Sequence, residues 1–295
     1  MEKYLLSCES PVDLSYSYVN ERGISVINYY YLIDGEPHID DMGKDPNSLN
    51  KFYQFLKEGK LPSTSQVNEF QYEEYFRNLL KQGHNVLHIA FGSGMTQSVN
   101  QAYLAAEAVR KEFPNQDLIV IDSVCSSSGY GMLVDDAYDL MQEGKDIKEI
   151  VSWIEENKTK IQHQFYSTDL KYLKRGGRVS GPAATVGSIL HLCPLMRLNY
   201  AGRIIAYSKV IGKKKAIKSI VDEMEAHAEN GLNYAGKVFI SNSNCLADAE
   251  MCKQEILKRF PNVKEIKIFD IGTVIASHTG PGTVALFFHG DERIK

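Results

Sequence analysis

The chain has 295 residues and a formal net charge of −4; 43% of the residues are hydrophobic and 24% are charged. A chain of this length can bury roughly three quarters of the surface that it exposes when unfolded, which suits two domains or one large one. The small negative charge gives no basis for nucleic-acid binding, which would show a basic excess or a basic stripe.

The first half of the chain alternates strand-like and helix-like segments. Strands are predicted at 4–7, 26–33, 86–90 and 118–122, and helices at 46–59, 69–81, 99–113, 128–142 and 147–160. Strands that alternate with helices favour a mostly parallel sheet. We therefore expect an N-terminal α/β domain over residues 1–160.

The pattern changes at residue 161. Short strand-like runs at 163–166, 196–199 and 203–208 surround a glycine-rich segment, and helices at 214–229 and 246–259 then alternate with strands at 238–241 and 265–269. A second α/β domain over residues 161–295 follows from this pattern, and its last strand either stays there or returns to the first domain. A ligand site between the two domains is the expected arrangement.

Two hydroxyl-rich loops lie beside predicted elements in the first domain. One contains Thr64 and Ser65, and the other contains Ser93, Gly94 and Thr96. Ser93 falls in the turn between a strand and a helix, where free backbone N–H groups and the positive end of the helix dipole suit an anion. Simple helix capping by Ser93 or Thr96 is the alternative, and the two roles are compatible.

His278 stands between an apolar run at 271–276, predicted as a strand, and the turn formed by Gly280, Pro281 and Gly282. The glycines permit unusual φ values and the proline restricts its own, so the chain reverses there and a second strand follows at 284–288. A lone histidine is compatible with an ordinary hydrogen bond to the backbone as well as with a binding site. Which of these two roles His278 has depends on the residues that lie near it.

Taken together, these segments resemble the DegV family of bacterial proteins over nearly the whole chain. The motifs that carry the resemblance are Cys8-Glu9-Ser10 with Asp13-Leu14, Thr64-Ser65-Gln66, Ser93-Gly94 with Gln97-Ser98, Val120-Ile121-Asp122-Ser123, Gly176-Gly177-Arg178 and the segment from His278 to Gly282. Each motif is weak alone, but their order and spacing are specific.

Several members of this family are fatty-acid-binding proteins, so the resemblance implies a carrier without catalytic residues of its own. It would hold a long-chain fatty acid such as palmitate in an apolar tunnel, with no cofactor and no metal, and present the carboxylate to a separate ATP-dependent fatty acid kinase subunit. The resemblance also implies that Thr64 and Ser93, with Ser65 and Gly94 beside them, bind the carboxylate. His278 would support that network, and Arg178 would lie at the mouth of the site or meet the partner.

Several positions depart from the family pattern. Val67 replaces a proline, Met95-Thr96 replaces Thr-Tyr, Cys8-Glu9 replaces Thr-Asp, and Ile211 stands where arginine is usual. Because isoleucine cannot bind phosphate, fatty-acid binding is better supported than coupling to a kinase. An apolar run of this kind more often forms ordinary core than the wall of a ligand tunnel. The candidate tunnel-wall residues are Val186, Ile189, Leu190, Leu192, Leu195 and Met196.

Two other functions remain as alternatives. A serine-dependent ester hydrolase would use Ser93 with His278 and Asp122, but Phe91 and Met95 break the Gly-x-Ser-x-Gly motif. A substrate-binding protein like those of dihydroxyacetone kinases is the second, and the chain has no phosphate-binding loop of the Gly-x-x-x-x-Gly-Lys-Ser/Thr type.

The five cysteines are odd in number and include no Cys-x-x-Cys pair, which predicts reduced thiols and a cytoplasmic location. No apolar stretch is long enough to span a bilayer, so any membrane contact would be peripheral. His84 and His88 have the spacing of a zinc-protease pair, but the glutamate is missing and the segment is strand-like. No metal site is expected.

Overall fold

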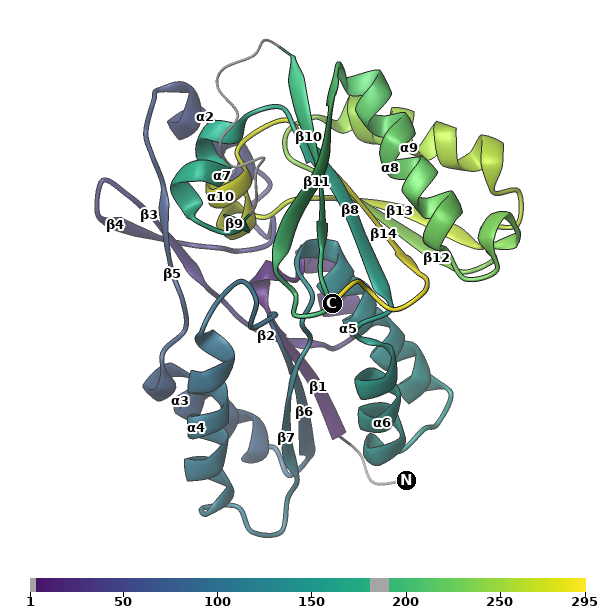
Figure 1. Cartoon of the computed structure of the whole chain (residues 1–295). Helices are drawn as coiled ribbons and strands as arrows, with labels where there is room; N and C mark the ends of the chain where they lie inside the picture. Colours follow the sequence, from purple (N-terminus) through teal and green to yellow (C-terminus); the bar gives the residue numbers. More distant parts are fainter. Residues whose placement is uncertain (1–3, 181–190) are drawn as a thin grey trace.

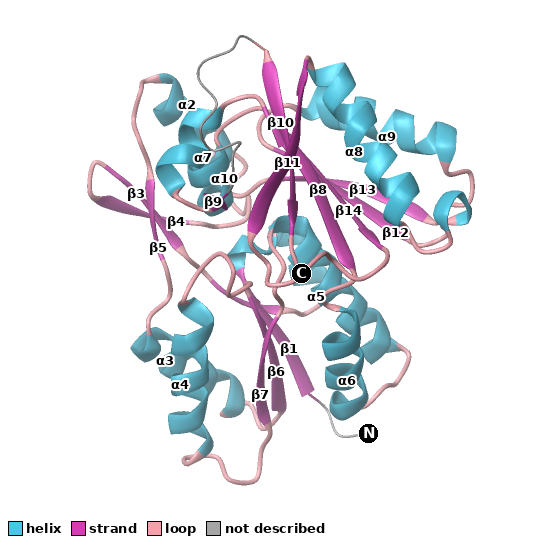
Figure 2. Ribbon diagram, in the orientation of Figure 1, coloured by secondary structure: helices cyan, strands magenta, loops and turns pink. Residues whose placement is uncertain are grey.

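Three β-sheets organise the chain in the computed structural model, which describes residues 4–180 and 191–295. The first sheet is four-stranded and parallel, in the order β2-β1-β6-β7. Helices α3 and α4 cover one face and helices α5 and α6 the other (Figure 2). The bounds are β1 Tyr4–Glu9, β2 Ser25–Ile27, β6 Asn85–Ala90, β7 Leu118–Asp122, α3 Glu69–Leu80, α4 Ser98–Arg110, α5 Ser127–Gln142 and α6 Ile147–Asn157.

The second sheet is seven-stranded and mixed, in the order β13-β12-β14-β8-β10-β11-β9. Helices α8 and α9 cover its outer face, and its inner face looks toward the first half of the chain (Figure 1). The bounds are β8 Ile161–Ser167, β9 Val179–Ser180, β10 Leu192–Leu198, β11 Ile204–Ile211, α8 Lys213–His227, β12 Lys237–Asn242, α9 Leu246–Arg259, β13 Glu265–Asp270 and β14 Thr283–His289.

A small antiparallel sheet in the order β4-β3-β5 lies to one side of both larger sheets (Figure 1). Helix α10 packs against this sheet and against α7, so residues near 64 and near 278 come together. The bounds are η1 Ser10–Val12, α1 Tyr16–Glu21, β3 Tyr30–Ile33, β4 Glu36–Ile39, α2 Ser48–Lys57, β5 Ser63–Ser65, α7 Leu170–Gly176, η3 Gly231–Asn233 and α10 Thr273–Thr279.

The α/β class and the parallel sheet of the first half confirm the prediction. All strands of the parallel sheet precede residue 123, and all described strands of the mixed sheet follow residue 160. This supports a domain boundary near residue 160, which stays a proposal. The last strand, β14, pairs with β8 and β12 in the mixed sheet. One hydrophobic cluster joins the halves, since Ile121 shares it with Phe165 and Phe287.

The strand predicted at 271–276 is wrong, because the segment from Thr273 forms helix α10. Its first amides find acceptors far away in sequence. The Gly272 N–H donates to Asp13 Oδ1 at 2.9 Å, and the Thr273 N–H and hydroxyl donate to Asp40 Oδ1 at 3.2 and 2.8 Å. Two buried carboxyl groups that accept hydrogen bonds from the first amides of the helix therefore override the strand preference of a β-branched run.

The single strand predicted at 26–33 is also wrong, because the chain leaves the parallel sheet after Ile27 and enters the small sheet at Tyr30. The two residues between are held by other partners. The Asn28 side-chain amide donates to the Asp40 carbonyl at 2.7 Å. The Tyr29 N–H donates to Ser10 Oγ at 3.1 Å, and the Tyr29 carbonyl accepts from the Asp40 N–H at 3.0 Å. These bonds replace the ladder bonds of a continuous strand.

Candidate ligand-binding site

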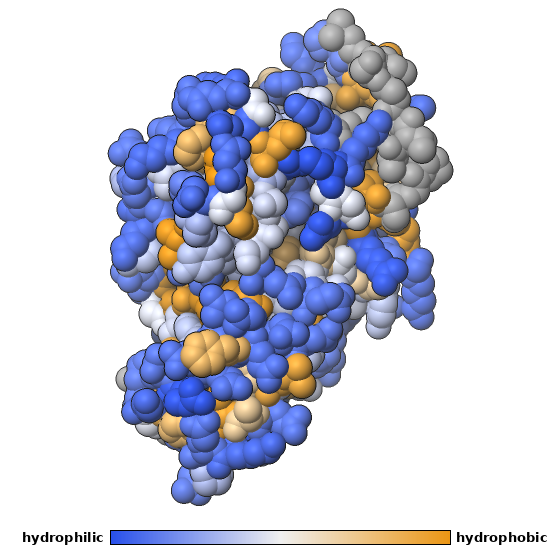
Figure 3. Space-filling model, turned by 90° about the vertical axis from the view of Figure 1, so that its left-hand side faces the viewer, coloured by the Kyte–Doolittle hydropathy of each residue, from blue (hydrophilic) through white to orange (hydrophobic). Residues whose placement is uncertain are grey.

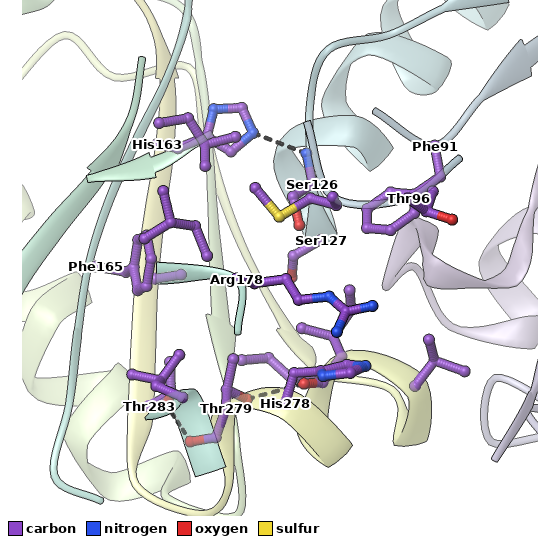
Figure 4. Close-up of a pocket in the computed structure, with 18 of the residues that line it drawn as sticks. Phe91, Thr96, Ser126, Ser127, His163, Phe165, Arg178, His278, Thr279 and Thr283 are labelled. Atoms are coloured by element: carbon purple, nitrogen blue, oxygen red, sulfur yellow. Dashed lines mark hydrogen bonds between the residues drawn. The ribbon is translucent and has the colours of Figure 1, made fainter. Parts of the chain in front are cut away.

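A cavity of about 330 Å³ lies between the inner face of the mixed sheet, helix α10 and the loops that follow β6 and β7. Half of the described residues that line it are apolar. These residues are Phe91, Met95, Phe165, Leu173, Leu198, Ile204, Ile271, Val274, Ile275, Ala285 and Phe287. In Figure 4, His163 and Phe165 of β8 lie on one side, Phe91 and Thr96 on the opposite side, and the Arg178 side chain extends between them.

Thr64 and His278 meet at this cavity and both line it. The Thr64 Oγ1 atom lies 2.8 Å from His278 Nε2, although 214 positions separate the two residues. Strand β5 explains the placement, since successive side chains of a strand point to opposite faces. Thr64 is half-buried, whereas Ser63 and Ser65 are exposed. Ser65 thus faces away from Thr64 and is not among the described residues that line the cavity.

The imidazole of His278 is neutral at physiological pH. Burial lowers the pKa of His278 to about 4, and the positive charges of Arg178 and Arg175 add to this effect. A neutral ring has one N–H, and we assign it to Nε2, which then donates to Thr64. The Thr64 hydroxyl hydrogen is thereby free to point into the cavity, which makes Thr64 a donor to an anionic group.

Helix α7 and the turn after it hold the imidazole in place. A Cβ atom on Gly176 would lie 2.9 Å from His278 Nδ1, so only glycine allows the ring to approach the helix this closely. Arg175 donates to the carbonyls of Pro62 and Ser277, which ties α7 to the start of β5 and to α10. Arg178 lines the cavity, is exposed, and donates to the Gly176 carbonyl.

The loop after β6 has a packing role that the sequence did not reveal. A Cβ atom on Gly94 would lie 2.3 Å from the Gly202 carbonyl oxygen, so the loop lies directly against the turn between β10 and β11. The Ser93 N–H donates to Asp122 Oδ1 at 3.0 Å and is therefore not available to an anion. Neither Ser93 nor Gly94 is among the described lining residues. The Ser93 hydroxyl has no hydrogen-bond partner in the described part of the chain, and its predicted role stays a prediction.

The far end of the cavity carries polar groups that sequence reasoning missed. His163 is buried, and its Nε2 accepts from the Ser126 N–H at 3.2 Å while Nδ1 lies 2.9 Å from the Ile161 carbonyl oxygen. Burial, together with the Arg293 charge, holds the pKa of His163 well below its usual range, so this ring is neutral too. His163 and Phe165 are two positions apart on strand β8, so their side chains point to the same face of the sheet, and both line the cavity. This spacing is the one sequence feature that could have predicted the position of His163.

None of the tunnel-wall candidates that the structure describes is among the residues lining this cavity. Val186, Ile189 and Leu190 lie outside the described residues. Leu192, Leu195 and Met196 are buried but absent from the lining, and Leu195 packs in the cluster beneath α8. Ordinary core was the better interpretation for the three that the structure describes.

A family model described as an uncharacterised protein of the DegV family matches residues 6–291. The chain belongs to the DegV family. A DegV domain-containing protein of Clostridium perfringens is 38% identical over 293 residues, which is 99% of each chain. Another from Caldanaerobacter subterraneus is 31% identical and covers 98% of this chain and 99% of its own.

Solved structures share the fold of this DegV protein. A fatty-acid-binding DegV family protein from Thermus thermophilus has a TM-score of 0.86 at 28% identity, covering 98% of this chain and 100% of its own. One from Streptococcus agalactiae has a TM-score of 0.81 at 28% identity, covering 99% and 100%. A DegV lipid-binding protein from Thermotoga maritima, at 24% identity, has a TM-score of 0.86 and covers 99% and 100%.

The outer surface of this DegV protein is less hydrophobic than the lining of its cavity. On the face that carries the small sheet, α3 and α4, hydrophobic side chains are exposed only in separate small patches (Figure 3).

Among residues 4–180 and 191–295, no group of histidine, cysteine or acidic side chains is arranged to hold a metal ion. No helix in the same ranges is both long and apolar enough to cross a bilayer.

Proposed function

We propose that this DegV protein binds one long-chain fatty acid in the cavity, with the carboxylate at Thr64 and His278 and the acyl chain along the apolar lining. The observation that carries the proposal is the Thr64–His278 pair, which places an oriented hydroxyl at the edge of an apolar cavity beside Arg178. The relatives from Thermus thermophilus and Streptococcus agalactiae, described as fatty-acid-binding, support the same ligand class.

The acyl chain supplies most of the binding free energy. Burying about 14 methylenes contributes on the order of 10 kcal/mol before the loss of chain and rigid-body freedom is subtracted. The cavity of about 330 Å³ is within the size range of small-molecule sites. Affinity thus depends mainly on the length of chain that the cavity encloses.

The head-group contacts orient the ligand. A carboxylate that leaves water needs hydrogen-bond donors and a positive charge nearby, or it protonates. In the proposed complex Thr64 donates to the carboxylate, the neutral His278 donates to Thr64, and Arg178 provides the charge. The unpartnered Ser93 hydroxyl is a further donor in this proposal. Esters and alcohols would bind less well, because they leave these donors unsatisfied.

The proposed role is that of a carrier that works in the cytoplasm and presents the carboxylate to a separate ATP-dependent fatty acid kinase. Arg178 is exposed at the cavity, so a bound head group would lie within reach of a partner. Ile211 at the end of β11 is 66% exposed, and it offers no charge for docking or phosphate. Fatty-acid binding therefore has more support than kinase coupling. The five cysteines are all free thiols, consistent with a reducing compartment.

The geometry does not favour ester hydrolysis. His278 bonds to Thr64, not Ser93, and the carboxylate of Asp122 accepts from the Ser93 amide instead of orienting an imidazole. An imidazole whose pKa lies near 4 is also a weak general base at neutral pH.

The test is lipid extraction of the gently purified protein followed by mass spectrometry. We expect a co-purifying long-chain acid in the wild type. Thr64→Val should weaken binding about tenfold or more, because it removes a hydrogen bond to a charged group. Ser93→Ala should reduce occupancy too. Ser65→Ala is the matched control, since Ser65 points away from Thr64 on the same strand, and it should bind like the wild type. An empty wild type that also fails to bind added palmitate would refute the proposal.

A further inference from the structure

One wall of the cavity rests on a buried carboxylate that does not itself line it. Glu9 is the last residue of β1 and is fully buried. Its Oε2 accepts from the Tyr29 hydroxyl at 2.8 Å and from the Phe91 N–H at 3.2 Å. Its Oε1 accepts from the Tyr72 hydroxyl at 2.5 Å and lies 3.3 Å from His88 Nε2. All four contacts come from different elements or loops.

Two of these four partners form the cavity wall. Tyr29 and Phe91 both line the cavity, and their rings meet edge to face with centroids 6.4 Å apart. Glu9, Tyr72 and His88 are not among the described lining residues. The carboxylate therefore sits behind the wall and touches it at two points.

A third part of the wall is tied to the same carboxylate through Tyr72. The Tyr72 hydroxyl lies 2.9 Å from the Ser98 hydroxyl oxygen, and Ser98 is the first residue of α4. The loop before α4 contributes Met95 and Thr96 to the lining. Glu9 thus joins the start of β3, the end of β6 and the start of α4.

A fully satisfied buried network of this kind has little freedom to rearrange. A buried carboxylate is tolerated only when its oxygens are hydrogen-bonded, so displacement of any donor leaves charge uncompensated. Burial and the Glu9 charge raise the pKa values of Tyr29 and Tyr72 well above the usual range, which keeps both hydroxyls protonated as donors. The positions of the Tyr29 ring and of the Phe91 backbone are therefore fixed by Glu9.

We propose that Glu9 is a positioning residue that sets the width of the ligand cavity at Tyr29 and Phe91 and thereby selects among acyl chains. This inference rests on the proposed fatty-acid binding. Glu9 does not contact the ligand. It acts through the side chains and loop that its carboxylate holds, so changing its contacts alters selectivity more than it alters head-group binding.

The test compares two identical substitutions on helix α3. Tyr72→Phe removes a hydroxyl that bonds directly to Glu9 and to Ser98. Tyr75→Phe removes a hydroxyl that lies 2.8 Å from the Ser7 hydroxyl and is linked to Glu9 only indirectly, through Ser7 and His88. Dissociation constants are measured for myristate, palmitate, stearate and oleate. We expect Tyr72→Phe to change the ratio between two acids about fourfold, the equivalent of one methylene of burial. Tyr75→Phe should lower the melting temperature similarly but leave the ratios within about twofold.

Glu9→Asp provides a second variant. It keeps the charge but shortens the side chain by one methylene, so the carboxylate cannot reach all four donors unless the wall moves inward. A shift toward shorter or bent acids is expected. Unchanged ratios in Tyr72→Phe would overturn the inference, as would equal shifts in both tyrosine variants, whether or not Glu9→Asp folds. A wild type that binds no fatty acid would refute the proposed function instead.

Discussion

The approach of His278 to Gly176 allows a sharp test of the head-group site. A Cβ atom added at Gly176 would lie 2.9 Å from His278 Nδ1 and 3.4 Å from its Cβ. Ordinary contact between such atoms needs about 0.5 Å more, so the imidazole must move away in Gly176→Ala. The other nitrogen of the same ring, Nε2, bonds to Thr64 at 2.8 Å, so moving the ring distorts or breaks that bond.

Loss of this bond frees Thr64 from the orientation that makes it a donor to the ligand. One hydrogen bond of this kind is worth about 1 kcal/mol, which corresponds to a roughly fivefold weaker affinity. The free energy of unfolding should change little, because two effects oppose each other. The lost hydrogen bond destabilises the fold, whereas alanine in place of Gly176, the last residue of helix α7, favours the helix by up to about 1 kcal/mol. The two quantities are measured by displacement of a fluorescent fatty acid and by urea denaturation.

Gly177→Ala is the matched control, because it makes the same change one residue later. Gly177 has a φ of 63°, and no atom of the described residues lies within 4 Å of an added Cβ atom. Alanine in this left-handed conformation costs about 1 kcal/mol of stability, but it does not touch His278. We therefore expect Gly177→Ala to lose stability and keep its affinity. If it weakens binding as much as Gly176→Ala does, or if neither variant weakens binding, the reasoning about His278 is wrong.

Three further predictions concern stability. The pKa of His278 falls from 6.5 to about 4 on folding, so the folded state binds fewer protons in that window. The free energy of unfolding therefore decreases as the pH falls from 6.5 to 4. In denaturant titrations at pH 7 and pH 4, this decrease should be on the order of 3 kcal/mol larger for the wild type than for His278→Gln. The Lys237 ammonium contacts three α5 carboxylates at 2.7 to 2.9 Å. Lys237→Met should cost about 3 kcal/mol, and the exposed control Lys111→Met under 1 kcal/mol, in urea unfolding. Gly94→Ala should cost about 2 kcal/mol by calorimetry, because its Cβ would overlap the Gly202 carbonyl; an unchanged melting temperature would contradict that packing.

Local signals in the sequence were sufficient for elements whose own residues decide their structure. Helix α9 begins and ends where its apolar period predicts, at Leu246–Arg259, and β7 matches its predicted range as well. The parallel sheet followed from the alternation of strands and helices. The family and the pairing of Thr64 with His278 at one site came from short motifs, and these contain no information about the walls of a cavity.

Long-range contacts decided the rest. Helix α10 depends on Asp13 and Asp40, which lie more than 230 positions earlier, and no window around His278 contains them. The lining from β8 and β14 depends on which strand face turns inward, and that is set by sheet order. In the sequence, Glu9 is not distinguishable from any other polar residue at the end of a strand. Its contacts with Tyr29, Tyr72 and Phe91 are formed only in the folded protein. The sequence by itself determined the elements and the residue types that can hold a carboxylate. Only the tertiary structure decided which of them converge, because convergence depends on contacts between residues that no local pattern connects.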